Sequence, residues 1–129
     1  MDKFTAVNSD VMSGLAASGL EVYPEDYSGN IANEKRFARY SVLMPTSYSY
    51  EYSRGAMVSG MLMIRLFSER GFAGKDSYTD AATLNTALES KLFSNNTRFG
   101  KSMLTQPQPD ADNESLVMVV YSIPFTYYE

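Results

Sequence analysis

The segment Gly71-Phe72-Ala73-Gly74-Lys75 is the part of the sequence that looks most like a chemical site, because a loop of this kind could cradle a phosphate. A phosphate-binding loop follows the pattern GxxxxGK[ST], in which backbone N–H groups surround the anion. Glu69 stands where the first glycine is required, and Asp76 stands where serine or threonine is required. A carboxylate at a helix entrance would also repel the phosphate. We therefore interpret both glycines as turn geometry rather than as part of a nucleotide site.

The side chains that most enzymes use near neutral pH are missing from the sequence. With no histidine and no cysteine, the chain cannot build Ser-His-Asp or Cys-His catalysis, or a thiolate metal site. Paired carboxylates remain possible catalysts. The acidic residues, however, fall mainly in predicted loops and on helix exteriors, where we expect them to be solvated. We therefore predict a protein that is not an enzyme and needs no cofactor, with a small carboxylate enzyme as the minor alternative.

Residues 110–114, with the sequence DADNE, have the oxygen-rich composition of a calcium loop. An EF-hand loop needs glycine after the fifth ligand position and glutamate at the twelfth. Ser115 and Tyr121 stand at these two positions. We therefore expect a solvated turn here, and no metal site.

Length and composition favour one domain without a membrane anchor. The chain has 129 residues, and domains commonly hold about 100 to 200, so we predict a single domain over residues 1–129. No apolar run approaches the ~20 residues that a membrane helix requires. Without cysteine, nothing ties the chain to an oxidising compartment. We therefore expect an intracellular protein without a membrane partner.

The net charge of −4 is unevenly distributed along the chain. Residues 1–30 carry −4, residues 31–104 carry +4, and residues 105–129 carry −4. Such blocks can give a subunit oppositely charged faces, which suit head-to-tail association. A mixed, solvated surface is the simpler alternative. Because the chain is acidic overall, high affinity for nucleic acid is not expected.

Two segments have the periodicity of amphipathic helices. In residues 3–18, apolar side chains recur at spacings of three and four, and Gly19 supplies a stop. In residues 77–93, a similar stripe follows Asp76 or Ser77 as the cap. The expected core positions of the two helices are Phe4, Val7, Val11, Met12 and Leu15, and then Ala81, Leu84, Leu88 and Leu92.

The main strands are expected at residues 35–45, 56–67, 98–106 and 115–128. Residues 19–34 are rich in turn formers and are predicted as a loop. Pro124 is expected to turn the end of the last strand into an edge or a bend. The resulting order is α-β-β-α-β-β. It predicts an α+β fold in which both helices pack on one antiparallel or mixed sheet of about four main strands.

The strand over residues 56–67 is apolar on both faces, which requires cover on both sides or a partner on one of them. One face holds Leu62, Ile64 and Leu66, and the other holds Met61, Met63, Arg65 and Phe67. Because methionine is adaptable, the second face is either core or a contact surface.

Three tyrosines just before this strand alternate with polar residues, which predicts an exposed hairpin arm. Tyrosine is enriched in the centres of protein interfaces. Ordinary sheet packing is one alternative, and stacking on nucleic-acid bases is another, although only Arg54 stands close enough to assist. The predicted subunit or partner contacts are Tyr48, Tyr50, Tyr52, Arg54, Met61, Met63, Arg65, Glu69 and Arg70.

The linear pattern resembles the tail terminator, or tail completion, proteins of long-tailed bacteriophages, the family typified by the lambda minor tail protein U. The resemblance rests on FARYSVL at 37–43, GMLMIRLF at 60–67, GFAG at 71–74 opening the second helix, and IPFTY at 123–127. It spans nearly the whole chain. The sequence departs from the family in its tyrosines at 48–52 and in lacking a tryptophan in the first strand.

This resemblance implies a structural virion protein. Members form a homohexameric ring that caps the tail tube, stops its polymerisation and provides the surface that joins tail to head. The implied partners are the tail tube protein and a head-completion or stopper protein, while genome DNA passes through the lumen without specific binding. The implied location is the tail or neck of the virion, assembled in the bacterial host cytoplasm. The alternatives are a head-side stopper, a tail tube protein, or a monomeric module that binds a ligand or nucleic acid.

Overall fold

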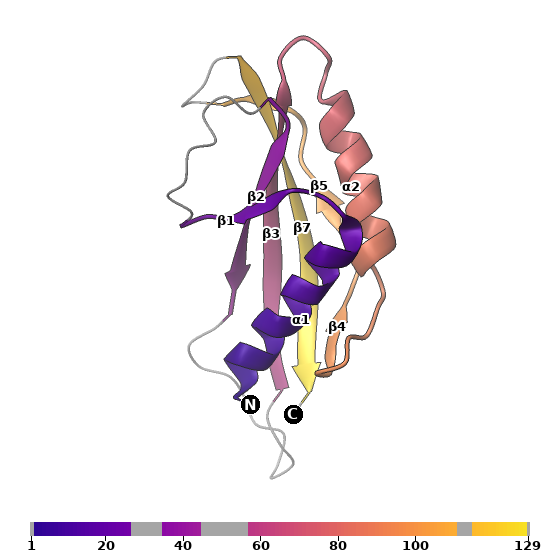
Figure 1. Cartoon of the computed structure of the whole chain (residues 1–129). Coiled ribbons are helices and arrows are strands. Elements are labelled where there is room, and N and C mark those ends of the chain that lie inside the picture. The colour runs from indigo at the N-terminus through magenta and orange to yellow at the C-terminus, as the bar shows by residue number, and fades with distance from the viewer. Residues whose placement is uncertain (1, 27–34, 45–56, 111–114, 129) are drawn as a thin grey trace.

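The computed structural model describes residues 2–26, 35–44, 57–110 and 115–128, which form two helices and seven strands (Figure 1). The helices are α1 (Lys3–Ser18) and α2 (Lys75–Leu88). The strands are β1 (Val22–Pro24), β2 (Phe37–Leu43), β3 (Met57–Glu69), β4 (Thr97–Phe99), β5 (Met103–Leu104), β6 (Gln108–Pro109) and β7 (Leu116–Tyr128).

All seven strands belong to one mixed sheet. Its order is β1-β2-β3-β7-β4, with β5 and β6 also pairing with β7. The β1–β2 pair is parallel and the other pairs are antiparallel. The predicted α+β class with a mixed sheet is therefore confirmed.

The predicted count of about four strands is wrong, because three short strands carry no side-chain periodicity of their own. β1 forms inside the predicted loop, and β6 forms between the strands predicted at 98–106 and 115–128, where no strand was expected. The single strand expected at 98–106 is divided into β4 and β5. Each of these short segments is held by backbone pairing with a long neighbouring strand, which a local sequence pattern does not reveal.

The first helix ends where it was predicted, and the second does not. Gly19 adopts the left-handed conformation with φ 73° and closes α1. α2 begins after Gly74, and neither predicted side chain caps it. The hydroxyl of Ser77 instead donates to the carbonyl of Leu66 at 3.2 Å. α2 ends at Leu88 rather than near residue 93, because the chain turns back to form the isolated bridge between Leu92 and Arg98.

Both helices cover the same face of the sheet, and the main core lies between the two layers (Figure 1). Most of the predicted core positions are buried there, including Val7, Leu62 and Leu84. Phe4, Met12 and Leu92 are exposed instead. Two small or polar residues, Ala6 and Asp10, take the inner positions of α1. None of the described helices is long and apolar enough to cross a membrane.

The end of β7 is neither an edge nor a bend, so the expectation at Pro124 is wrong. This residue pairs with Met61 of β3, and its carbonyl accepts the N–H of Gly100 at 2.8 Å. Because the N and O of one residue point to the same side of an antiparallel strand, the missing N–H of proline faces the Gly100 side. Gly100 directs its own carbonyl to the N–H of Ser90, so the interruption between β4 and β5 accommodates the proline.

Gly60 of β3 lies where there is no room for a side chain. A Cβ added there would collide with the carbonyl oxygen of Leu43 and stand 2.5 Å from Cζ of Phe125. We therefore expect Gly60→Ala to lower the free energy of unfolding by about 1–3 kcal/mol, the usual cost of overpacking. Urea denaturation would measure the change. Ser59→Ala on the opposite face is the control, and equal stability of the two variants would contradict the close approach.

Tyr121 of β7 is buried in the core, and its hydroxyl donates to Oδ1 of Asn85 at 2.7 Å. Burial raises the pKa of Tyr121 to about 12, whereas an unfolded tyrosine has a pKa of about 10. The folded state therefore favours the neutral phenol. We expect this contribution to stability to be complete below pH ~10 and to be lost as the pH rises towards ~12. Urea midpoints measured across this range should fall less steeply in Tyr121→Phe, and parallel curves would contradict the assignment.

Candidate assembly surface

The sheet face turned away from the helices is the main candidate for a contact surface, and we call it the open face. Successive side chains of a strand point to opposite faces. Since Leu62, Ile64 and Leu66 point to the helices, the side chains of the alternate positions of β3 belong to the open face. Strand register sets Met61 between Leu43 and Pro124, Met63 between Ser41 and Ser122, and Arg65 between Arg39 and Val120.

One end of the open face is apolar and accessible. Met61 and Met63 are half-buried, and their neighbour Leu43 is 53% exposed. Met103 of β5, which lies beside Ser122 in the same row as Met63, is 67% exposed. A hollow of about 580 Å³ adjoins this end, lined by Val42, Leu43, Met44, Ser59, Gly60 and Met61. Contiguous exposed apolar area of this kind is typical of protein contact sites.

At the other end of the open face, aromatic side chains pack against one another. The rings of Phe37 and Phe67 stack with centroids 4.6 Å apart. Leu116 is buried with them, and Tyr23 and Met118 pack against the group. Because this small second core is buried, the accessible apolar part of the open face is limited to the rows that contain Met61 and Met63.

Arg65 is held in place between these two ends. Its Nε and Nη2 donate to the two carboxylate oxygens of Glu25 at 2.7 and 2.6 Å. Its guanidinium carbon lies 5.3 Å from the centroid of the Phe67 ring. Arg39 donates to the backbone carbonyl of Glu25 at 3.3 Å. A bidentate pair stacked on an aromatic ring is a rigid arrangement, so this part of the open face is preorganised.

The structure brings together only part of the predicted contact set. Met61, Met63 and Arg65 share the open face as expected. Glu69 lies at the far end of β3, where its carboxylate pairs with Lys35 at 3.3 Å. Arg70 follows the strand and is exposed, and its backbone N–H donates to the carbonyl of Ser115. The remaining members, Tyr48, Tyr50, Tyr52 and Arg54, lie outside the described residues.

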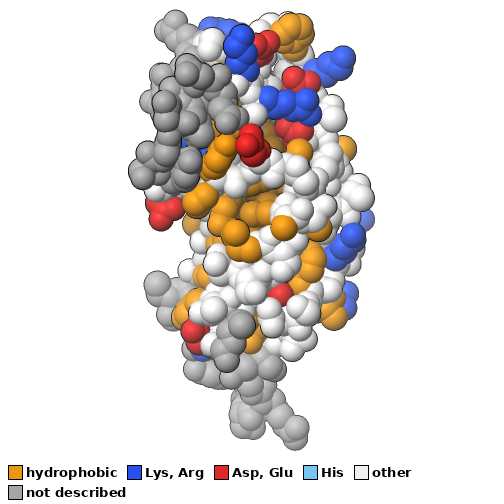
Figure 2. Space-filling model, in the orientation of Figure 1, with side chains coloured by type: hydrophobic (Ala, Val, Ile, Leu, Met, Phe, Trp, Pro, Cys, Tyr) orange, Lys and Arg blue, Asp and Glu red, His pale blue; other side chains and the backbone are white. Residues whose placement is uncertain are grey.

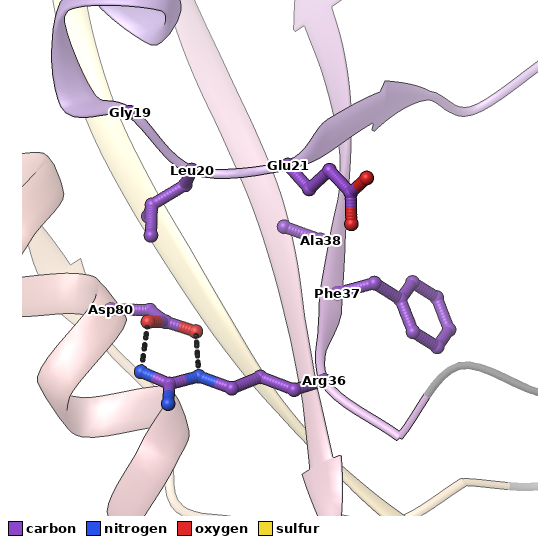
Figure 3. Close-up of a pocket in the computed structure, with 7 residues that line it drawn as sticks. All are labelled: Gly19, Leu20, Glu21, Arg36, Phe37, Ala38 and Asp80. Atoms are coloured by element: carbon purple, nitrogen blue, oxygen red, sulfur yellow. Dashed lines mark hydrogen bonds and ion pairs between the residues drawn. The ribbon is translucent and has the colours of Figure 1, made fainter.

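Two buried carboxylates were missed, because the acidic residues were expected mainly in loops and on helix exteriors. Asp80 of α2 accepts from Nε and Nη2 of Arg36 at 3.2 and 2.6 Å (Figure 3). This hydrogen bonding raises the pKa of Arg36 above its usual value. The pair lines a pocket of about 180 Å³ beneath Leu20 and Glu21. It ties the start of β2 to α2, and Nη1 of Arg36 lies 3.7 Å from Oδ1 of Asp76 on the same helix.

The second missed carboxylate is Asp10 of α1, which is 1% exposed. Its oxygens accept the backbone N–H groups of Asn95 and Thr97, each at 3.1 Å. Helical spacing contains a signal for both acids. Asp10 stands three positions after the buried Val7, and Asp80 stands four positions before the buried Leu84, so each lies on the inner stripe of its helix.

The fold is shared with solved structures, although no protein-family profile matches the chain. No curated protein matches its sequence. A solved protein whose name states no function superposes with a TM-score of 0.71 at 12% identity, over 100% of this chain and 97% of the other. A chain from the virion of a native gene transfer agent particle superposes with a TM-score of 0.56 at 13% identity, over 98% and 91%. At these identities the likeness establishes the fold alone.

Proposed function

We propose that this chain is a structural subunit of a phage-like particle. The observation that carries the proposal is the similarity, over almost the full length of both chains, to a chain of the gene transfer agent virion. Because the similarity covers both helices and the whole sheet, it concerns the complete described fold and not a common local motif. The proposed role requires no catalytic group and no cofactor.

The open face supports a subunit that works in an assembly. Soluble monomers rarely expose large contiguous apolar patches, whereas this sheet leaves Leu43, Met61, Met63 and Met103 uncovered by either helix. We propose that these side chains are buried against a neighbouring subunit in the particle. The pair of Arg65 and Glu25 adds a rigid polar border to that contact.

More specifically, we propose a tail terminator, as the motifs at 37–43, 60–67, 71–74 and 123–127 suggest. In this role, copies of the chain form a ring, hexameric in the family that it resembles, which caps the tail tube and stops its polymerisation. The ring would join the tail to a head-completion or stopper protein in the neck of the virion. Genome DNA would pass through its lumen without specific binding.

Electron microscopy of the purified chain separates this role from its alternatives. A terminator is expected to form closed rings that bind the ends of tail tubes and shorten the tubes when added during their polymerisation. A tail tube protein would form long tubes by itself. A head-side stopper would form rings that bind heads in preference to tubes, and a chain that remains monomeric and binds neither would contradict the proposal.

A further inference from the structure

One edge of the sheet is acidic. β1 is the first strand in the sheet order, and three carboxylates flank it, while residues 19–26 contain no lysine or arginine. Glu21 and Asp26 are exposed, and Glu25 reaches back to Arg65 on the open face. We call Glu21, Glu25 and Asp26 the acidic margin.

The opposite edge is basic. β4 is the last strand in the sheet order and carries Arg98, and the segment beside it carries Lys91, whose carbonyl accepts the N–H of Phe99. Lys101 follows β4, and residues 90–104 contain no acidic residue. Glu89 lies just outside this segment and is already engaged by the N–H of Ser102 at 3.0 Å. We call Lys91, Arg98 and Lys101 the basic margin.

The charges of both margins are available to a partner. Glu21, Asp26, Lys91, Arg98 and Lys101 are exposed, and none of them forms an ion pair with another described residue. The two margins stand at opposite sides of the sheet (Figure 1). In the space-filling view, acidic side chains stand at the side of β1 and basic ones at the opposite side, while side chains of both signs lie near the start of α2 (Figure 2).

Apolar side chains accompany both sets of charges. Leu92, next to Lys91, is 54% exposed on the basic margin. The acidic margin is continuous with the open face, because Glu25 holds Arg65 in the row next to Met63. A contact between the margins would therefore combine opposite charges with apolar area, which is the usual composition of a specific interface.

We propose that the basic margin of one copy docks on the acidic margin and adjoining open face of the next copy. This inference rests on the proposed function and names the partner of the open face as a second copy of the same chain. When the margins dock edge to edge, each copy meets one neighbour with each margin. Such head-to-tail contacts close into a ring when the rotation allows.

A charge-exchange experiment tests the contact directly. The acid-reversed variant is Glu21→Lys with Asp26→Lys, and the base-reversed variant is Lys91→Glu with Arg98→Glu; Lys101 is left unchanged because it lies near Glu89. In either variant alone, side chains of like charge would face each other at the contact. We therefore expect its dissociation constant for self-association to rise at least 10-fold. Mixing the two in equal amounts restores opposite charges at every contact. We expect the mixture to regain the molar mass of the wild-type assembly in light scattering.

Circular dichroism and the thermal midpoint would first establish that each variant is folded. If one of them is not, Glu21→Gln with Asp26→Asn, which removes charge without reversing it, should still raise the dissociation constant and flatten its dependence on salt. Reversed variants that assemble like the wild type would overturn this inference while leaving the proposed function in place. A mixture of folded variants that stays monomeric would also overturn it. A wild-type chain that never assembles would overturn the proposed function as well.

Discussion

Met61→Glu is expected to yield a folded monomer under conditions in which the wild-type chain assembles. Met61 lies on the open face between Leu43 and Pro124, two rows from the nearest arginine of that face, Arg65. A carboxylate buried there against a neighbouring copy would have no arginine or lysine opposite it in the described strands of its own chain. Leaving a charge unpaired at an interface costs several kcal/mol. With about 3 kcal/mol lost, the dissociation constant should rise on the order of 100-fold.

The matched control places the same substitution on the opposite face. Met12 of α1 is an exposed methionine, at 48%, and it lies in the helix layer. We expect Met12→Glu to assemble like the wild type, with sedimentation velocity as the measurement for both variants. Loss of assembly in both, or in neither, would show that the open face is not the contact surface.

Asp10→Ala is expected to lower the stability of the fold far more than the loss of an exposed helix cap. Asp10 joins α1 to Asn95 and Thr97, which lie 85 and 87 positions further along the chain. Without the carboxylate, two backbone N–H groups lose their acceptor, and each such loss in a buried place costs about 1–3 kcal/mol. We therefore expect the free energy of unfolding to fall by roughly 3 kcal/mol, measured by urea denaturation.

Two further variants make this result specific. Asp10→Asn keeps the shape and one acceptor oxygen, so its loss should be intermediate. Asp2→Ala removes the exposed N-cap of α1, which accepts the N–H of Thr5, and should cost only about 1 kcal/mol. If Asp10→Ala costs no more than Asp2→Ala, the buried carboxylate does not hold the helix layer to the start of β4.

Local pattern was sufficient to predict the long elements and the composition of the open face. α1 repeats apolar residues at helical spacing up to Gly19, and β3 alternates two apolar sets, one on each face. That alternation alone places Met61, Met63 and Arg65 on the same face of the sheet. Their role in a contact between subunits remains a prediction.

Features that depend on distant partners could not be predicted in the same way. β1 forms because its backbone pairs with β2. β5 and β6 form because their backbones pair with β7. Pro124 fits inside the sheet only because β4 ends opposite it. Asp10 and Asp80 look like surface acids until the N–H groups of Asn95 and Thr97 and the guanidinium of Arg36 are brought to them.

The charge pattern could be predicted only in part from the sequence. The sequence contains blocks of opposite sign, which predicts opposed faces if the blocks separate in space. Only the sheet order shows that Glu21 and Asp26 stand at one edge while Lys91 and Arg98 stand at the other. The same order sets β1 next to β2, which carries Leu43 of the open face, so a head-to-tail contact at this edge would combine charge with apolar area.

Light scattering coupled to size exclusion, applied to the wild-type chain over a range of concentrations, tests the central claim most directly. The chain mass is 14.4 kDa. Assembly through the open face predicts a discrete species of several times this mass, which becomes dominant as the concentration rises. A mass of one chain at the highest attainable concentration, together with no binding to tail tubes, would contradict the claim that this protein is an assembling subunit of a phage-like particle.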